Sequence, residues 1–135
     1  MNEVVSMLTP QQAGSNLHMT IILGLPAIVL LGVGTLLYFI SHEKYTFAHG
    51  VLAGLSLLLT TINILTILPM TSVVLSVPGI DLFHLIHIIV GAVGYIFGLA
   101  AFVTGISGVR TKVPGLIAFV CWTTVFVMGY VQFLM

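Results

Sequence analysis

The stretch DLFHLIHIIVGAVGYIFGLAAFVTGIS, residues 81–107, decides the fold of this chain. Its only formally charged side chain is Asp81, the first residue, and most positions after it carry apolar side chains or glycine. A helix needs about 20 predominantly apolar residues to cross the roughly 30 Å hydrocarbon core of a bilayer. The stretch exceeds that length, so it predicts a membrane-spanning helix.

Three further stretches of the same kind occur along the 135-residue chain. Hydrophobic residues make up 59% of the sequence and charged residues only 4%, whereas a soluble domain carries about 25% charged residues. This composition predicts a single domain whose main partner is the lipid bilayer. The expected spans are approximately 19–40, 45–68, 82–107 and 115–135.

Short connections join the first span to the second and the third to the fourth, and helices joined so tightly are antiparallel neighbours. Residues 18–135 therefore predict an all-α integral membrane domain, a bundle of four transmembrane helices in up-down-up-down order. Residues 1–17 form a polar N-terminal lead. Pro69 lacks a backbone N–H and is expected to end the second span.

The few cations predict how the bundle is oriented. Lys44, Arg110 and Lys112 all lie in the two short connections, on one side of the predicted bundle. Because cytoplasmic connections carry an excess of Lys and Arg, we expect a multi-pass protein of the cell membrane with both termini extracytoplasmic. The net charge of zero gives no indication of a nucleic-acid partner.

The sequence contains no pattern typical of an autonomous enzyme. It has no recognisable nucleophile–base pair, phosphate-binding loop or pair of catalytic carboxylates. Its single cysteine, Cys121, excludes a disulfide within the chain and is interpreted as a small packing residue. We therefore expect a protein that is not itself an enzyme, although it could be a subunit of an oxidoreductase complex.

A possible metal or haem site opens the third span. Asp81, His84 and His87 are spaced i, i+3, i+6 and share one helix face, and His18 and Met70 are expected at the same membrane face. Imidazole and thioether ligands suit copper or a haem iron. One helix cannot place two histidines three residues apart on opposite sides of a porphyrin, so a haem would need His18 or Met70 as well.

The alternative interpretation of this end is structural. Asp81 could cap the helix as a supporting residue, and the histidines could bond loops or headgroup water. Haem b, copper and the absence of any cofactor therefore all remain open.

A set of small residues and one tryptophan predicts close helix packing. The set is Gly91, Gly94, Gly98, Gly105, Trp122 and Gly129. A glycine strip is typical of helix–helix contact, although it could also accommodate a flat macrocycle. Trp122 lies too deep for a residue of the membrane interface, so we expect it to pack against another helix or a partner protein.

His49 lies near the other end of the bundle. With a rise of 1.5 Å per residue it lies about 5 Å from its membrane boundary, and His87 lies about 9 Å from the opposite one. About 16 Å of a ~30 Å core then separates the two, so one metal cannot bind both. His49 is either part of a second site or a hydrogen-bonding residue inside the bundle.

The order of these features resembles a known family. His49 opens the second span, His87-Ile88-Ile89 opens the third, and the chain ends in Trp122-Thr-Thr-Val-Phe-Val-Met-Gly129-Tyr-Val-Gln-Phe-Leu-Met. The pattern is similar to that of small four-helix membrane proteins, one branch of which serves as cytochrome c oxidase maturation factors (CtaM-like proteins). The resemblance implies an accessory protein that handles haem or copper for a respiratory oxidase.

This chain departs from the family pattern at two places. The family carries further histidines near the end of span two and in the last connection, where this chain has Pro69-Met70 and Val109–Lys112. If the family histidines hold a haem or metal at each face, the resemblance implies that the inner site is lost here, because His49 lacks its partner, while the outer site could use Met70 or His18. The alternative function is a non-catalytic accessory subunit of a large membrane complex, such as a haem–copper oxidase or a membrane copper monooxygenase, bound through other membrane subunits.

Overall fold

The computed structural model describes residues 10–76, 78–107 and 112–134, and this part of the chain is almost entirely helical. The helices are α2 (Pro10–Ile40), α3 (His42–Ser76), α4 (Leu82–Ile106) and α5 (Lys112–Leu134). The expected all-helical fold is confirmed.

Each of the four helices contains a segment long and apolar enough to cross a membrane. These segments are Ile21–Ile40, Glu43–Pro69, Leu82–Ile106 and Lys112–Val131. Large apolar side chains also point outward from every helix, and Ile22, Phe47 and Ile106 are 61%, 84% and 73% exposed. A surface this rich in exposed apolar side chains indicates a multi-pass membrane protein.

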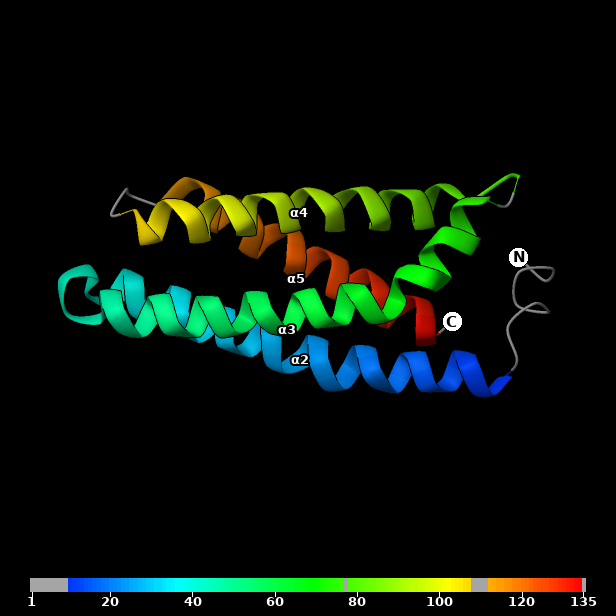
Figure 1. Ribbon diagram of the computed structural model, residues 1–135, viewed down its shortest axis with the longest axis horizontal. Helices are drawn as coiled ribbons and strands as arrows, with labels where there is room; N and C mark the ends of the chain where they lie inside the picture. Colours follow the sequence, from blue (N-terminus) through cyan, green and yellow to red (C-terminus); the bar gives the residue numbers. More distant parts are fainter. Residues whose placement is uncertain (1–9, 77, 108–111, 135) are drawn as a thin grey trace.

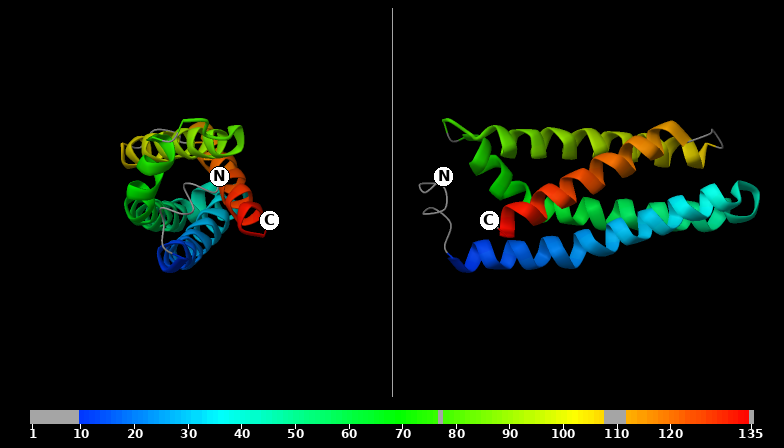
Figure 2. Two further views of the ribbon diagram at one scale, coloured as in Figure 1. Left: turned by 90° about the vertical axis from the view of Figure 1, so that its right-hand side faces the viewer. Right: turned by 180° about the vertical axis from the view of Figure 1, so that it is seen from behind.

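The helices form two hairpins, α2 with α3 and α4 with α5. Consecutive helices run in opposite directions along the long axis, and α5 crosses obliquely from the end of α4 toward α2 (Figures 1 and 2). Contacts are extensive within each hairpin and sparse between the two hairpins. The space between the hairpins is therefore the least tightly packed part of the bundle.

Two helix boundaries, both at prolines, differ from the sequence prediction. α2 already begins at Pro10, inside the segment predicted as a polar lead. Proline fits the first helical position because the N–H it lacks would have no partner there. The prediction that Pro69 ends the second helix is wrong: α3 continues through Pro69 to Ser76. The last turns of α3 bend toward α4 (Figure 1), as expected of a proline kink.

The turn between α3 and α4 has a defined conformation at Gly79 and Asp81. Gly79 has a φ of +84°, a left-handed conformation that favours glycine. Asp81 is the N-cap of α4, and its side chain accepts hydrogen bonds from the backbone N–H groups of Phe83 (2.7 Å) and His84 (3.2 Å). These bonds satisfy two of the donors that a helix start leaves open.

Few side chains are fully buried among the described residues. The buried apolar ones are Ala27, Leu31, Leu57, Ala118 and Trp122. Ser56 is the buried polar one, and its hydroxyl donates a 2.6 Å hydrogen bond to the carbonyl of Ala27 across the α2–α3 interface. This bond compensates for the cost of placing a hydroxyl inside the bundle.

Trp122 packs directly on the glycine strip of α4. A Cβ atom at Gly94 would lie 2.6 Å from Cδ1 of Trp122 and 2.7 Å from Cβ of Cys121. At Gly98 it would lie 3.0 Å from Cζ2 of Trp122. The indole therefore occupies the part of the strip where the sequence left open a flat macrocycle, and the two glycines allow α4 and α5 to approach closely.

Candidate functional site

The end of the bundle that carries Asp81 and His84 is organised around the start of α4. Oδ2 of Asp81 lies 2.5 Å from Nδ1 of His84, in addition to the two capping bonds of the same carboxylate. The hydrogen bond with His84 is the main factor that holds the pKa of Asp81 below its ordinary value, and the backbone bonds act in the same direction. The pair is thus part of an exposed helix cap.

His87 has a different environment from His84, one turn away. A Cβ atom at Gly129 of α5 would lie 3.4 Å from Cε1 of His87, so the imidazole packs against the bare backbone of α5. Its Nδ1 atom is buried and has no hydrogen-bond partner among the described residues. The two histidines share a face of α4, but one lies in the cap and the other lies between α4 and α5.

The rest of the predicted outer site can be placed only in part. His18 lies in α2 and Met70 in α3, and their side chains fall outside those that the structure describes. Within the described residues, no group of three or more His, Cys, Asp and Glu side chains is arranged to hold a metal ion. Asp81, His84 and His87 therefore do not form a three-ligand site by themselves.

The glycine strip divides into a packed part and an open part. A Cβ atom at Gly91 would lie 3.7 Å from Cγ2 of Val125, which is ordinary van der Waals contact, and Gly94 and Gly98 lie against Trp122. Gly105, further along α4, is exposed and lines a cavity. The strip is thus covered by α5 along most of its length and opens only toward the end of α4.

This cavity lies between the two hairpins, at the end where α2 and α4 terminate. It has a volume of about 1030 Å³, at the upper limit of the roughly 300–1,000 Å³ usual for ligand pockets. The aromatic residues of its lining are Tyr38, Phe39, Phe47, Phe102 and Trp122. Its glycines are Gly50, Gly98, Gly105 and Gly115. Sequence reasoning missed this cavity, although glycines near the same ends of α3, α4 and α5 are the signal that could have indicated it.

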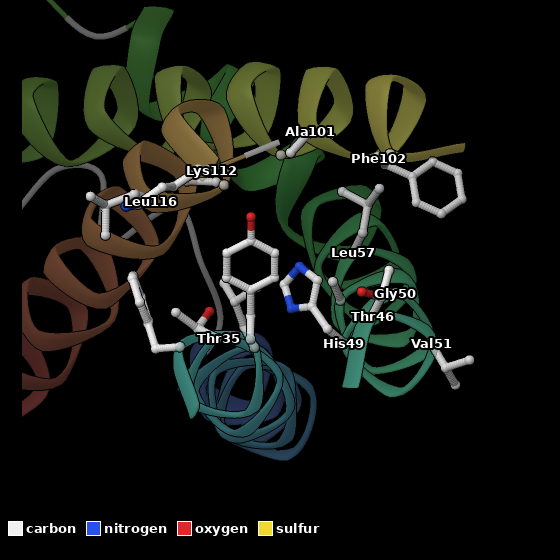
Figure 3. Close-up of a pocket in the computed structure, with 18 of the residues that line it drawn as sticks. Thr35, Thr46, His49, Gly50, Val51, Leu57, Ala101, Phe102, Lys112 and Leu116 are labelled. Carbon is white, nitrogen blue, oxygen red and sulfur yellow. The ribbon is translucent and has the colours of Figure 1, made fainter. Parts of the chain in front are cut away.

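His49 lies at the centre of the cavity wall (Figure 3). Its Nδ1 atom is 2.9 Å from the carbonyl oxygen of Gly34 on α2. Gly34 makes this approach possible, because a Cβ atom there would already lie 3.2 Å from Cβ of Leu52. The ring of Tyr38 lies beside the imidazole, with the ring centroids 5.0 Å apart. The interhelical hydrogen bond is one of the two roles that the sequence left open for His49.

The hydrogen bond also determines the tautomer of His49. A carbonyl oxygen can only accept, so Nδ1 carries the proton and donates it. In the neutral imidazole, Nε2 then has the free lone pair. Figure 3 shows this second nitrogen pointing away from α2, into the space between the hairpins. The hydrogen bond therefore fixes the imidazole of His49 so that the lone pair of Nε2 is directed into the cavity.

The charged side chains of the cavity lining are Glu43 and Lys112, each in the first turn of its helix. Nζ of Lys112 lies 6.0 Å from the centroid of the Phe39 ring, within the range of a cation–π contact. Deeper in, the walls are formed by apolar side chains such as Leu31 and Leu57. The cavity thus has an apolar interior and a charged rim, which suits an amphipathic ligand.

Comparison of this chain with known protein families, with curated proteins and with solved structures found no match.

Proposed function

We propose that this protein is an accessory protein of the cell membrane that holds a haem-type cofactor for a respiratory oxidase during the maturation of that enzyme. The observation that carries the proposal is the cavity between the hairpins, with an apolar interior and a fixed histidine. The resemblance at His49, His87 and the segment from Trp122 to Gly129 supports the oxidase context.

The proposed topology follows from the apolar segments and from the cations. Each helix crosses the membrane once, in up-down-up-down order. Lys44 and Lys112 lie in the first turns of α3 and α5, which Figure 1 places at the same end of the bundle. Because cytoplasmic connections carry an excess of Lys and Arg, we assign this end to the cytoplasmic side and both termini to the extracytoplasmic side. The cavity then opens toward the cytoplasmic side.

Of the two cofactors considered, haem has better support than copper. A protein-bound copper ion is usually held by several histidine, cysteine or methionine side chains. The described residues contain no group of three suitable His, Cys, Asp or Glu side chains. A haem brings four nitrogen ligands of its own and can be held by one histidine.

A second function, that of a non-catalytic accessory subunit, has support from the small buried core. The buried apolar side chains are few, and large apolar side chains are exposed along every helix. Partner helices of a haem–copper oxidase or a membrane copper monooxygenase could cover these faces. In that role the protein would remain in the mature complex, whereas a maturation factor leaves it.

The proposal is tested by affinity purification of the tagged full chain from its native membranes in mild detergent. A maturation factor is expected to copurify with an oxidase subunit in substoichiometric amounts, and deletion of its gene is expected to reduce the oxidase haem bands of the membranes. Stoichiometric association with a mature complex would favour the accessory subunit. Unchanged oxidase spectra together with no oxidase subunit in the purified fraction would contradict both functions.

A further inference from the structure

We propose that the cavity between the hairpins is a haem site in which Nε2 of His49 binds the iron. This inference rests on the proposed role in haem handling and assigns that role to one site, at the opposite end of the bundle from His84 and His87. Three features of the structure support this site: the orientation of one imidazole, the small number of protein ligands available and the character of the cavity.

The orientation of His49 is that of a prepared metal ligand. Histidines that bind metals usually donate their other ring N–H to a carboxylate or a backbone carbonyl, which fixes the tautomer and makes the free nitrogen more basic. The 2.9 Å bond from Nδ1 to the carbonyl of Gly34 supplies this partner. Figure 3 shows Nε2 directed into the cavity, where a ligand would meet it.

The number of ligands decides between a bare ion and a macrocycle. Residues that line the cavity include one histidine and neither cysteine nor methionine within the described part of the chain. A structural zinc or copper ion needs three or four protein ligands, so His49 cannot hold one alone. A metalloporphyrin needs only an axial ligand, as in the proximal histidine of globins and peroxidases. The geometry therefore favours haem as the ligand class.

The shape and chemistry of the cavity agree with such a ligand. The cavity lies between the two helical hairpins and has a volume of about 1030 Å³. Its wall includes aromatic side chains from three helices, such as Phe39, Phe102 and Trp122. Four glycines line the space, and a Cβ atom at Gly50 or Gly115 would meet nothing within 4 Å.

Lys112 lies at the rim, where its ammonium group suits the carboxylates of a porphyrin. Glu43 is the other charged residue of the rim. Its carboxylate would repel the carboxylates of a porphyrin, so these are expected on the side of Lys112.

The outer histidines offer less to a haem. The imidazole of His87 packs against Gly129, and its Nδ1 atom is buried without the second partner that orients a metal ligand. Nδ1 of His84 does have such a partner, the Asp81 carboxylate at 2.5 Å, but this pair belongs to an exposed helix cap and does not line the cavity. The same substitution at His49 and at His87 therefore separates the two possible sites.

The test is a titration of the purified full chain, in lipid nanodiscs, with haemin and with reduced haem b, followed by visible absorption. The wild-type protein is expected to bind one haem and to shift its Soret band. The first variant is His49→Asn, whose side-chain amide can still donate to Gly34 but has no counterpart of Nε2. We expect at least an approximately tenfold loss of affinity, since even second-shell changes cost that much. The control variant, His87→Asn, is expected to bind as the wild type does.

A second variant tests the cavity without changing the ligand. Gly50 lines the cavity, and a Cβ atom there would have no neighbour within 4 Å. Gly50→Leu should therefore fold normally, place its side chain at the haem site and weaken haem binding. Helical content and thermal unfolding of each variant in the nanodisc show whether it is folded.

Several outcomes would overturn the inference. Wild-type haem binding that survives His49→Asn but is lost in His87→Asn would place the site at the outer end. If the wild type binds a hydroquinone analogue and no haem, Nε2 of His49 accepts a hydrogen bond from a ligand hydroxyl and does not bind a metal. If the protein binds no haem but still copurifies with an oxidase, both the haem site and the role in holding haem are wrong, and the association with an oxidase alone stands.

Discussion

Gly94 is the residue at which α4 and α5 approach most closely among the glycines of α4. A single added methyl group would lie 2.6 Å from Cδ1 of Trp122 and 2.7 Å from Cβ of Cys121. The Cys121 atom is attached directly to the helix backbone, so it can retreat only if α5 moves as a whole. The requirement for glycine at this position is therefore steric, and it couples the position of Trp122 to the spacing of the two helices.

Gly94→Ala is therefore expected to destabilise the protein by about 1–3 kcal/mol, the usual cost of overpacking a filled interior. The measurement is reversible unfolding in mixed micelles, followed by Trp122 fluorescence. Gly91→Ala is the matched control, because its methyl group would meet Val125 at an ordinary distance of 3.7 Å. Equal stability of the two variants would show that α4 and α5 lie too far apart for the added methyl group at position 94 to touch Trp122 and Cys121.

Asp81 gives the helix cap a defined dependence on pH. Because the hydrogen bond with His84 lowers the pKa of Asp81 in the folded protein, the stabilisation is present above the ordinary carboxyl pKa and is lost as the pH falls through the lowered value. The relevant range lies below about pH 4.

We expect the wild-type protein to lose part of its stability on acidification through this range, whereas Asp81→Asn should lack that component. Asparagine is also a good N-cap residue, so the variant should fold at neutral pH. Unfolding curves of both proteins between neutral pH and pH 3 test this expectation. If the stability of both proteins changed with pH in the same way, the Asp81 carboxylate would have the same pKa in the folded and the unfolded protein.

At the scale of the helices, α3 shows what a proline does inside an apolar segment. Pro69 removes one backbone hydrogen bond, yet the helix continues to Ser76 and its last turns bend toward α4. A proline kink is tolerated in membrane helices when neighbours or local adjustments compensate for the lost bond. The bend directs the end of α3 toward the turn at Gly79 and Asp81.

Replacing this proline should straighten the helix. In Pro69→Ala the missing N–H is restored, and we expect the end of α3 to move away from α4. Distances between spin labels at Leu75 on α3 and Val93 on α4, measured by pulsed electron paramagnetic resonance, should lengthen relative to wild type. A label pair at Leu55 and Val93 serves as the control. No change at Leu75 would show that the bend has another cause.

The sequence predicted the helices themselves better than where they end or which residues of neighbouring helices they contact. Runs of about 20 apolar residues predict membrane spans, because length and polarity alone determine whether a helix can cross. The effect of Pro69 could not be predicted, since it depends on neighbouring helices. Helical periodicity placed Gly94 and Gly98 on one face but could not show that Trp122 covers them. Nor could it show that Gly34 accepts the hydrogen bond of His49.

At the scale of the whole molecule, the two hairpins are separate packing units joined by few contacts. One of these is the hydrogen bond between Tyr95 of α4 and Thr61 of α3, with 3.0 Å between the hydroxyl oxygens. Thr61 donates its own proton to the carbonyl of Leu57, so Tyr95 is the donor. The cavity is lined by residues of all four helices, so it depends on how the two hairpins are placed relative to each other.

Tyr95→Phe should loosen the association of the hairpins. Interhelical hydrogen bonds in membrane proteins contribute about 0.6 kcal/mol on average and at most about 1.7 kcal/mol, so we expect a loss in this range. Tyr130→Phe is the control, because Tyr130 is 56% exposed on α5. Unfolding in micelles measures both. A larger effect of the control would contradict the assignment of Tyr95 to the hairpin interface.

The most direct test of the central claim is the reduced-minus-oxidised visible spectrum of the full chain purified from its native membranes. Wild-type protein is expected to carry haem bands, and His49→Asn prepared in equal yield is expected to lack them, because only the variant has lost Nε2 inside the cavity. Wild-type protein without haem bands, or bands that persist in His49→Asn, would contradict the claim that this cavity binds haem through His49.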